Sequence, residues 1–307
     1  MAEKDVSEKL LEAHNDVFSD IVNALLFQGE KVIAPDELEN HFTVAGYESK
    51  GKLRSMERDV SKHWKKGSIR LACIGLENQT QVDADMPLRI IAYDGAEYKR
   101  QLLSNSTERY PVITLVLYFG TKRKWKRPRS LLERIKVAEE LKPFVNDYKI
   151  HVFEIASLTP EQVKLFQSDF HVIADYLTQM KRQQAYTPSK QQLSHPEETF
   201  QMMKHLTGNK DYEKLLLPEE GGPVTMYDAL AEAKKEGIAQ GKREMYDALA
   251  EAKKEGIAQG KSEGFAQGQV TAMLDIATNM KRLGKYSDEA IVLVTKLSLE
   301  QVKAISV

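Results

Sequence analysis

Two different periods of apolar and polar residues follow one another along residues 7–181, and their order predicts an α/β fold. Apolar residues that recur every three to four positions predict helices, over residues 7–27, 85–103, 130–141 and 159–181, the last with a break near 168–169. Short runs rich in apolar and β-branched residues predict strands, at the end of the segment 53–60 and over residues 69–80, 110–120 and 148–156. The resulting order, α-β-β-α-β-α-β-α, predicts a mixed sheet covered by helices.

Polar residues interrupt this pattern at the end of the predicted strand 69–80. Side chains of a strand alternate between its two faces, so Glu77 and Gln79 are expected side by side on one face. Asp59 precedes Glu77 by eighteen positions and stands before the basic turn Lys65–Ser68 that leads into the same strand. Mg²⁺ takes one or two carboxylates together with water and phosphate oxygens. Asp59 and Glu77 are therefore candidate ligands of one Mg²⁺ ion, with Mn²⁺ as a substitute, although strand-end carboxylates also occur simply solvated.

Several short motifs around these residues resemble one nuclease family. They are Asn15–Asn23, Arg58-Asp59-Val60, Gly75–Thr80, Asp85–Arg89 and Tyr93-Asp94. Together they are similar to the Rpn family of recombination-promoting nucleases and putative transposases, a branch of the PD-(D/E)XK nuclease superfamily. The likeness covers residues 8–160 and, more loosely, the glycine-rich tail.

The resemblance implies a restriction-endonuclease-like α/β core, a mixed sheet flanked by helices, and Mg²⁺-dependent cleavage of DNA. It assigns Asp59 to the first acidic position and Glu77 to the second. Gln79 falls where the superfamily usually has lysine, so the catalytic set is Asp59, Glu77 and Gln79, with Asp59 and Glu77 as metal ligands. A glutamine can orient water or bind a phosphate oxygen, but it supplies no positive charge.

Arg89 and Tyr93 are expected to support this site from the predicted helix 85–103. Four residues separate them, so they share a face of the helix. If this face is turned toward Glu77, Arg89 can bind a phosphate through two hydrogen bonds and replace part of the missing lysine. A structural contact between arginine and carboxylate, with the tyrosine packed beneath it, is the alternative.

A basic segment after the predicted strand 110–120 is the candidate DNA-binding surface. It consists of Lys122, Arg123, Lys124, Trp125, Lys126 and Arg127. Cations around an aromatic ring suit phosphate contacts combined with base stacking. The turn His63–Lys66 has the same character and is expected to extend a phosphate-binding track.

The last third of the chain contains a tandem repeat. Residues 226–242 recur unchanged at 245–261, and Gly256, Gly260, Gly264 and Gly268 continue a spacing of four. On a helix these glycines form a smooth stripe, and each costs about 1 kcal/mol relative to alanine. Close approach of a partner helix would offset this cost and form a homo-oligomer, most simply a dimer; a length-variable helical spacer is the alternative. Two short helices are expected over residues 270–283 and 288–305, the second splitting near Leu297; they either read DNA or simply pack or dimerise.

Composition limits the remaining choices. The chain has 307 residues, a formal net charge of −1 and one cysteine, so neither an internal disulfide nor a cysteine-based zinc site is expected. The start resembles no signal peptide and no apolar run is long enough to cross a bilayer, which predicts a cytoplasmic protein without a membrane partner. The expected parts are a nuclease-like domain (residues 1–184), a connector with short helices (185–225), the helical repeat (226–268) and small terminal helices (269–307).

These features predict a Mg²⁺-dependent DNA endonuclease. A catalytically weak relative that binds DNA or a protein partner is the rival, because Gln79 replaces the lysine. A scaffold built around the glycine-rich tail is a third interpretation.

Overall fold

Strand β5 (Ile69–Gln79) is the central strand of a five-stranded sheet with the order β1-β4-β5-β6-β7. The computed structural model describes residues 10–41, 44–49, 52–57, 59–209, 212, 215 and 223–306. On one side, β4 (Val60–Lys66) is antiparallel to β5, and β1 (Leu38–His41) is antiparallel to β4. On the other side, β6 (Val112–Tyr118) and β7 (His151–Glu154) continue the sheet in parallel. The predicted α/β class, with a mixed sheet flanked by helices and a helical C-terminal part, is confirmed.

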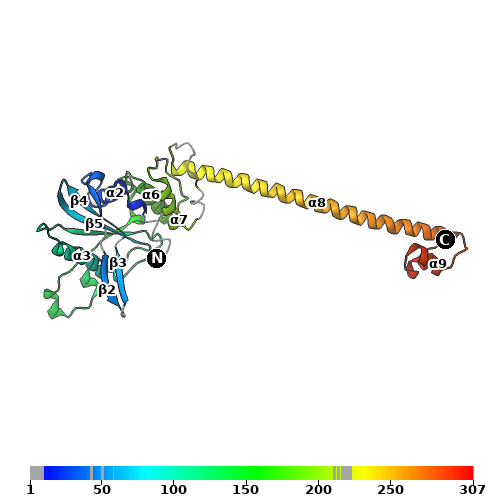
Figure 1. The fold of residues 1–307 in the computed structure, drawn as a ribbon, viewed down its shortest axis with the longest axis horizontal. Coiled ribbons are helices and arrows are strands. Elements are labelled where there is room, and N and C mark those ends of the chain that lie inside the picture. The colour runs from blue at the N-terminus through cyan, green and yellow to red at the C-terminus, as the bar shows by residue number, and fades with distance from the viewer. Residues whose placement is uncertain are drawn as a thin grey trace. The chain divides into compact units, whose positions relative to one another are not determined.

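Side chains alternate between the two faces of β5 and β6, which separates the core into two layers. One face carries Ala72, Ile74 and Leu76, which pack with helices α2 (Asn15–Leu26), α6 (Phe170–Lys181) and α7 (Pro196–Thr207). The opposite face of β6 packs against α3 (Met86–Leu103) through an apolar cluster that includes Val116 and Ile90. In Figure 1, α2 and α6 lie on one side of β5 and α3 on the other. Each face is thus covered, as the apolar run of β6 requires.

Several predicted elements differ from those observed. The segment 53–60, expected to hold one strand at its end, contains all but the first residue of β3 (Lys52–Glu57), which pairs with β2 (Val44–Ser49) in a separate two-stranded sheet; β4 begins at Val60, the last residue of the segment. The helix predicted to begin at Ser7 starts outside the described residues; residues 10–12 are helical, and the chain turns at residues 13–14 before α2. The predicted break at residues 168–169 is confirmed between α5 (Pro160–Val163) and α6.

The prediction of a helix over residues 130–141 was wrong beyond the first helical turn. Only α4 (Leu131–Arg134) is α-helical, followed by 3₁₀ turns at Glu139–Phe144 and, after β7, at Ile155–Ser157. Ser130 caps α4 but also forms a β-bridge with Lys149. This long-range pairing holds Ser130 itself in an extended conformation, so the helix begins only at Leu131.

The second structural unit comprises residues 235–307, and the first comprises residues 1–234. Helix α8 (Met226–Arg282) runs for 57 residues without a break, so the repeat and the helix predicted at residues 270–283 form one element. Its end packs with α9 (Asp288–Thr295) and α10 (Leu299–Ala304) around the buried residues Ala277, Ile291 and Val302. The predicted split near Leu297 is confirmed. The expected domain boundaries at 184, 225 and 268 stay a prediction.

None of the described helices combines the length and apolar character needed to cross a bilayer.

Lys62 of β4 is fully buried and joins three segments. Its ammonium group donates to Ala13 O and Asn15 Oδ1, each at 2.7 Å, and to Asn40 Oδ1. These bonds satisfy the carbonyl at the turn before α2 and fasten it to β1 and β4. A buried ammonium is tolerable because three acceptors replace its water.

We expect Lys62→Met to lower the free energy of unfolding by about 3 kcal/mol, because three acceptors lose a fully buried charged donor. Burial lowers the pKa of Lys62 from 10.5 to about 8. Between these values the unfolded chain binds more protons than the folded chain, so the stability contributed by Lys62 rises with pH across this window. Denaturant unfolding at several pH values measures both effects, with exposed Lys66→Met as control. If the difference in the free energy of unfolding between wild type and Lys62→Met becomes smaller as the pH rises across this window, the role given to Lys62 is contradicted.

Candidate active site

Asp59 and Glu77 meet where the β4–β5 hairpin opens. Val60 pairs with Leu76 in the antiparallel register, which places Asp59, just before β4, beside the end of β5. The backbone N–H of Asn78 donates to Asp59 Oδ2 at 2.7 Å. This bond fixes the Asp59 carboxylate at the edge of β5, beside Asn78, which directly follows Glu77.

Glu77 and Gln79 share the face of β5 that is turned toward α3. Gln79 Nε2 donates to Glu77 Oε1 at 3.2 Å, as the two-residue period of a strand allows. Glu77 is only 1 % exposed, whereas Gln79 is half-buried. The sequence-predicted trio therefore lies in one place, with Asp59 and Glu77 on adjacent strand ends.

Arg89 and Tyr93 reach this place from the first turns of α3. Arg89 Nη2 donates to Glu77 Oε1 at 2.5 Å and to the Tyr93 hydroxyl at 3.1 Å, while Arg89 Nη1 donates to Asp83 Oδ2 at 3.2 Å. The helix face predicted to carry both residues is thus turned toward Glu77. The geometry shows the arginine–carboxylate contact that was the structural alternative for Arg89.

Charge and burial shift the pKa values of these groups. Burial lowers the pKa of Arg89, but the negative charge of Glu77 and the hydrogen bonds to Tyr93 and Asp83 together outweigh it, so the net shift is upward. Burial raises the pKa of Tyr93, and the charges of Glu77 and, to a smaller extent, Asp59 add to the increase. Arg89 is therefore a permanent cation and Tyr93 a neutral hydroxyl at neutral pH.

Two residues of this neighbourhood, Asn78 and Glu12, were assigned no role from the sequence. Asn78 points to the other face of β5, where its Nδ2 donates to Glu12 Oε2 at 2.7 Å. Glu12 is fully buried, although it follows two leucines in a pattern typical of an ordinary amphipathic helix. A carboxylate on the apolar side of such a helix is the one clue that the sequence offered.

The donor atoms of the trio fit a hard divalent cation. Carboxylate oxygens of Asp59 and Glu77 and the amide oxygen of Gln79 are ligands that Mg²⁺ prefers. Within the described part of the chain, groups of three or more histidine, cysteine or acidic ligands lie elsewhere, so no third residue of this kind joins Asp59 and Glu77. Two carboxylates leave most of the octahedral shell to water and phosphate, as is usual for Mg²⁺.

A cleft begins where β5 ends. It has a volume of 1160 Å³ and is lined by residues 80–82, the end of β6, residues of α6 and α7, and the basic residues Lys122, Arg123 and Lys124. A second pocket, of 480 Å³, lies between Val82 and the basic residues Lys122, Arg123, Lys124, Lys126 and Arg127. The basic segment therefore adjoins the strand end that carries Glu77 and Gln79.

Trp125 does not lie on this surface. Its side chain is 5 % exposed and meets Tyr118 edge-on, with ring centroids 5.4 Å apart. Packing with α3 and β6 draws the indole into the core while the neighbouring cations stay exposed. The proposed role of Trp125 in base stacking was wrong.

The basic segment His63–Lys66, expected to be a turn, is the last part of strand β4 and ends at the far end of the hairpin. Lys66 pairs with Ile69, so this end is separated from Glu77 by about 25 Å along β5. His63 is buried beneath α3, and the Trp64 indole N–H donates to Glu37 at 3.0 Å. The prediction that a phosphate-binding track extends from this segment to the site was wrong, because the antiparallel pairing of β4 and β5 places the two at opposite ends of the hairpin.

Residues 64–206 match the family model described as "Putative transposase, YhgA-like", a family of the PD-(D/E)XK and Rpn type. The resemblance expected from the motifs is thereby confirmed for this segment. It includes Glu77, Gln79, Arg89 and the basic segment, while Asp59 lies just before it. No curated protein and no solved structure matches the chain.

We expect Trp125→Ala to lower the free energy of unfolding by about 3–5 kcal/mol, because it opens a cavity beneath the basic segment. Lys124→Ala, one residue earlier and exposed, should change stability by less than about 0.5 kcal/mol. Denaturant unfolding of both variants measures the difference. Equal stabilities would show that the indole is not part of the core.

Proposed function

We propose that this chain, with its segment similar to YhgA-like transposases, is a Mg²⁺-dependent DNA endonuclease. The observation that carries the proposal is the meeting of Asp59, Glu77 and Gln79 at the end of β5, beside a cleft lined by cations. Phosphodiester hydrolysis needs an activated water and a sink for the charge on phosphorus. Oxygen ligands and a basic surface at one strand end suit both needs.

Asp59 and Glu77 would hold the ion, which, when bound, would lower the pKa of a water and stabilise negative charge on phosphate. Gln79 is close enough to Glu77 to orient that carboxylate or a water at the same face of the strand. The Asn78 amide keeps Asp59 in place, because its N–H is directed at the carboxylate rather than at a neighbouring strand.

Arg89 would take over part of the role of the missing lysine. Its side chain is 34 % exposed although one nitrogen contacts Glu77. A planar guanidinium can keep one carboxylate and offer its remaining N–H groups to a phosphate. Asp83 and Tyr93 fix the orientation of that plane.

DNA would cross the mouth of the cleft along the basic segment. The cations Lys122, Lys124 and Arg127 are exposed and surround the smaller pocket. Contacts of this kind bind backbone phosphates without reading sequence.

The Arg89–Glu77 ion pair also favours the rival function, a weak or inactive relative that binds DNA. At 2.5 Å the guanidinium takes up one oxygen of a carboxylate that would bind the metal. The two functions differ in cleavage and agree in DNA binding, so one assay separates them.

Self-association through α8 is the partner arrangement that the second unit supports. Large apolar side chains are exposed along this helix, among them Tyr246, Leu249, Ile257 and Phe265. A Cβ placed on Gly256, Gly260, Gly264 or Gly268 would meet no atom within 4 Å. A second copy of α8 could therefore approach closely along the glycine stripe, and paired chains would present two active sites to the two DNA strands.

We expect Glu77→Gln to slow Mg²⁺-dependent nicking of supercoiled plasmid at least about 100-fold, because the metal loses a charged ligand. Binding to the same plasmid should persist. Glu39→Gln, an exposed glutamate near the opposite end of the hairpin, is the matched control and should retain activity. Circular dichroism of both variants verifies folding.

Cleavage by Glu77→Gln at the wild-type rate would contradict this active site. A folded wild-type protein that shifts DNA on a gel but never cuts it with Mg²⁺ or Mn²⁺ would identify the chain as the DNA-binding relative.

Removing Lys122, Lys124 and Arg127 together by alanine substitution should weaken binding equally for unrelated DNA sequences. The plot of log K against log salt becomes less steep by about 0.9 for each lost phosphate contact. The slope of the triple variant should therefore be about 2.7 less steep than that of the wild type. Fluorescence anisotropy at several salt concentrations measures the slope. The double variant Lys65→Ala/Lys66→Ala should leave it unchanged; a larger effect there would move the DNA path to the other end of the sheet.

A further inference from the structure

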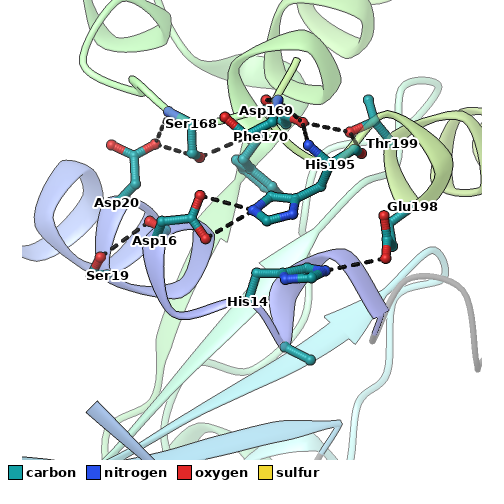
Figure 2. Close-up of polar contacts among 12 residues, drawn as sticks. His14, Asp16, Ser19, Asp20, Ser168, Asp169, Phe170, His195, Glu198 and Thr199 are labelled. Atoms are coloured by element: carbon teal, nitrogen blue, oxygen red, sulfur yellow. Dashed lines mark hydrogen bonds and ion pairs between the residues drawn. The ribbon is translucent and has the colours of Figure 1, made fainter. Parts of the chain in front are cut away.

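The N-terminal ends of α2 and α7 meet through two histidines and two carboxylates (Figure 2). His14 precedes α2 and His195 precedes α7, and each lies opposite an acidic residue in the first turn of the other helix. His195 Nε2 lies 3.0 and 2.9 Å from the two carboxylate oxygens of Asp16. His14 Nε2 lies 3.3 Å from Glu198 Oε1. The two imidazole rings are stacked, with centroids 3.6 Å apart and planes 20° apart.

The contact with Asp16 determines which nitrogen of His195 can bind a metal. An ionised carboxylate only accepts hydrogen bonds, so His195 Nε2 must carry the proton. Nδ1 then has the lone pair and is directed away from Asp16, toward the side on which Glu198 lies (Figure 2). A carboxylate that fixes a histidine in this way is the usual support of a metal-binding imidazole.

Spacing within the group suits a transition-metal ion. One donor atom from each of His14, His195 and Glu198 can be chosen so that all lie within 4.8 Å of one another. Without an ion, the 3.3 Å contact of His14 Nε2 with Glu198 Oε1 is a hydrogen bond donated by the imidazole. The same separation matches the distance of about 3.3–3.4 Å between donors that lie about 2.0–2.1 Å from a tetrahedral zinc ion, and Nε2 can bind the ion when the proton of His14 is on Nδ1. The side chain of His14 is 34 % exposed, so its ring can turn to bring its lone pair to the same point.

The backbone that carries these donors is firmly held. Asp169, nearly fully buried, accepts from the backbone N–H groups of Ser194 and His195 at 2.7–3.0 Å. Asp20 accepts from the backbone N–H groups of Gln167 and Ser168 and so joins α2 to the segment before α6. Metal ligands on a preformed scaffold lose little entropy when the ion binds.

A second group, His41, His63, Cys73 and Glu97, also brings donor atoms within 4.8 Å of one another but has its own cation. Arg100 donates to both oxygens of Glu97, at 2.9 and 2.7 Å. Burial raises the pKa of Glu97, but hydrogen bonds from His41, His63 and Arg100 leave it far below its ordinary value. The guanidinium balances this charge, so we assign no metal to that group.

We propose that His14, His195 and Glu198 form a site for a divalent transition metal of the zinc class, with Asp16 as the positioning residue. Two nitrogens and one carboxylate suit zinc, cobalt, nickel or iron better than magnesium. The ligands are partly exposed, so water can reach the ion and complete its coordination. This site is separate from Asp59 and Glu77, and its test does not require DNA cleavage.

Cobalt is the probe, because its bound form is coloured. Full-length protein at about pH 7.5, where ordinary imidazoles are neutral, is titrated with Co²⁺ in excess Mg²⁺ and then with Zn²⁺. We expect one tightly bound equivalent of Co²⁺, displaced by Zn²⁺. His14→Ala and His195→Ala should each lose that equivalent, while exposed His151→Ala retains it. Asp16→Asn should retain the ligands but weaken the affinity about 10- to 100-fold.

Circular dichroism and thermal unfolding verify that each variant is folded. If a histidine variant does not fold, Glu198→Gln replaces it, since it keeps the size of the side chain and removes the charged ligand. The proposal is overturned if wild-type protein binds no equivalent, or if the folded ligand variants bind as wild type does. A thiolate-to-cobalt charge-transfer band also overturns it, because the ion would then lie at Cys73.

Discussion

Hydrogen bonding along both edges of β5 is the constraint on which the first structural unit depends. Because β4 and β6 both pair with this strand, its register is fixed, with Glu77 opposite Val116 and Cys73 opposite His63. Alternation then sends Leu76 into the apolar layer and Glu77 toward α3. A slip of one residue would exchange these faces and place a carboxylate in the apolar core. The position of the candidate active site thus follows from the pairing of one strand.

The layer between β5 and α3 is unusually polar, and its charges occur in pairs. Glu77 meets Arg89, and Glu97 meets Arg100 and His41. An unpaired charge in such a layer would cost several kcal/mol, whereas a paired and hydrogen-bonded one is tolerated. The Glu97–Arg100 pair lies within α3, whereas Arg89–Glu77 and Glu97–His41 join the helix to β5 and β1. These two contacts fix the face of α3 that is turned toward the sheet, and with it the position of Arg89.

The short segment before α2 connects the two polar sites. Glu12 contacts Asn78 in the strand that carries the proposed catalytic residues, and His14 contacts Glu198 at the start of α7. Ala13 lies between Glu12 and His14, and the ammonium group of Lys62 holds it in place by donating a hydrogen bond to its carbonyl oxygen. The donor chemistry of the sites differs: oxygens alone at the strand end, nitrogens and a carboxylate at the helix ends. The same fold can therefore accommodate a hard and a softer cation without competition.

The sequence by itself determined the features that depend on local periodicity. The two-residue period of a strand placed Glu77 beside Gln79, the four-residue spacing placed Arg89 and Tyr93 on one helix face, and a hairpin brought Asp59 to the strand end. Tertiary structure alone decided what depends on distant segments: the burial of Trp125, the remoteness of His63–Lys66, and the meeting of His14 with His195. Periodicity reports which face a residue occupies, whereas the partner of that face is set by packing between segments far apart in the chain.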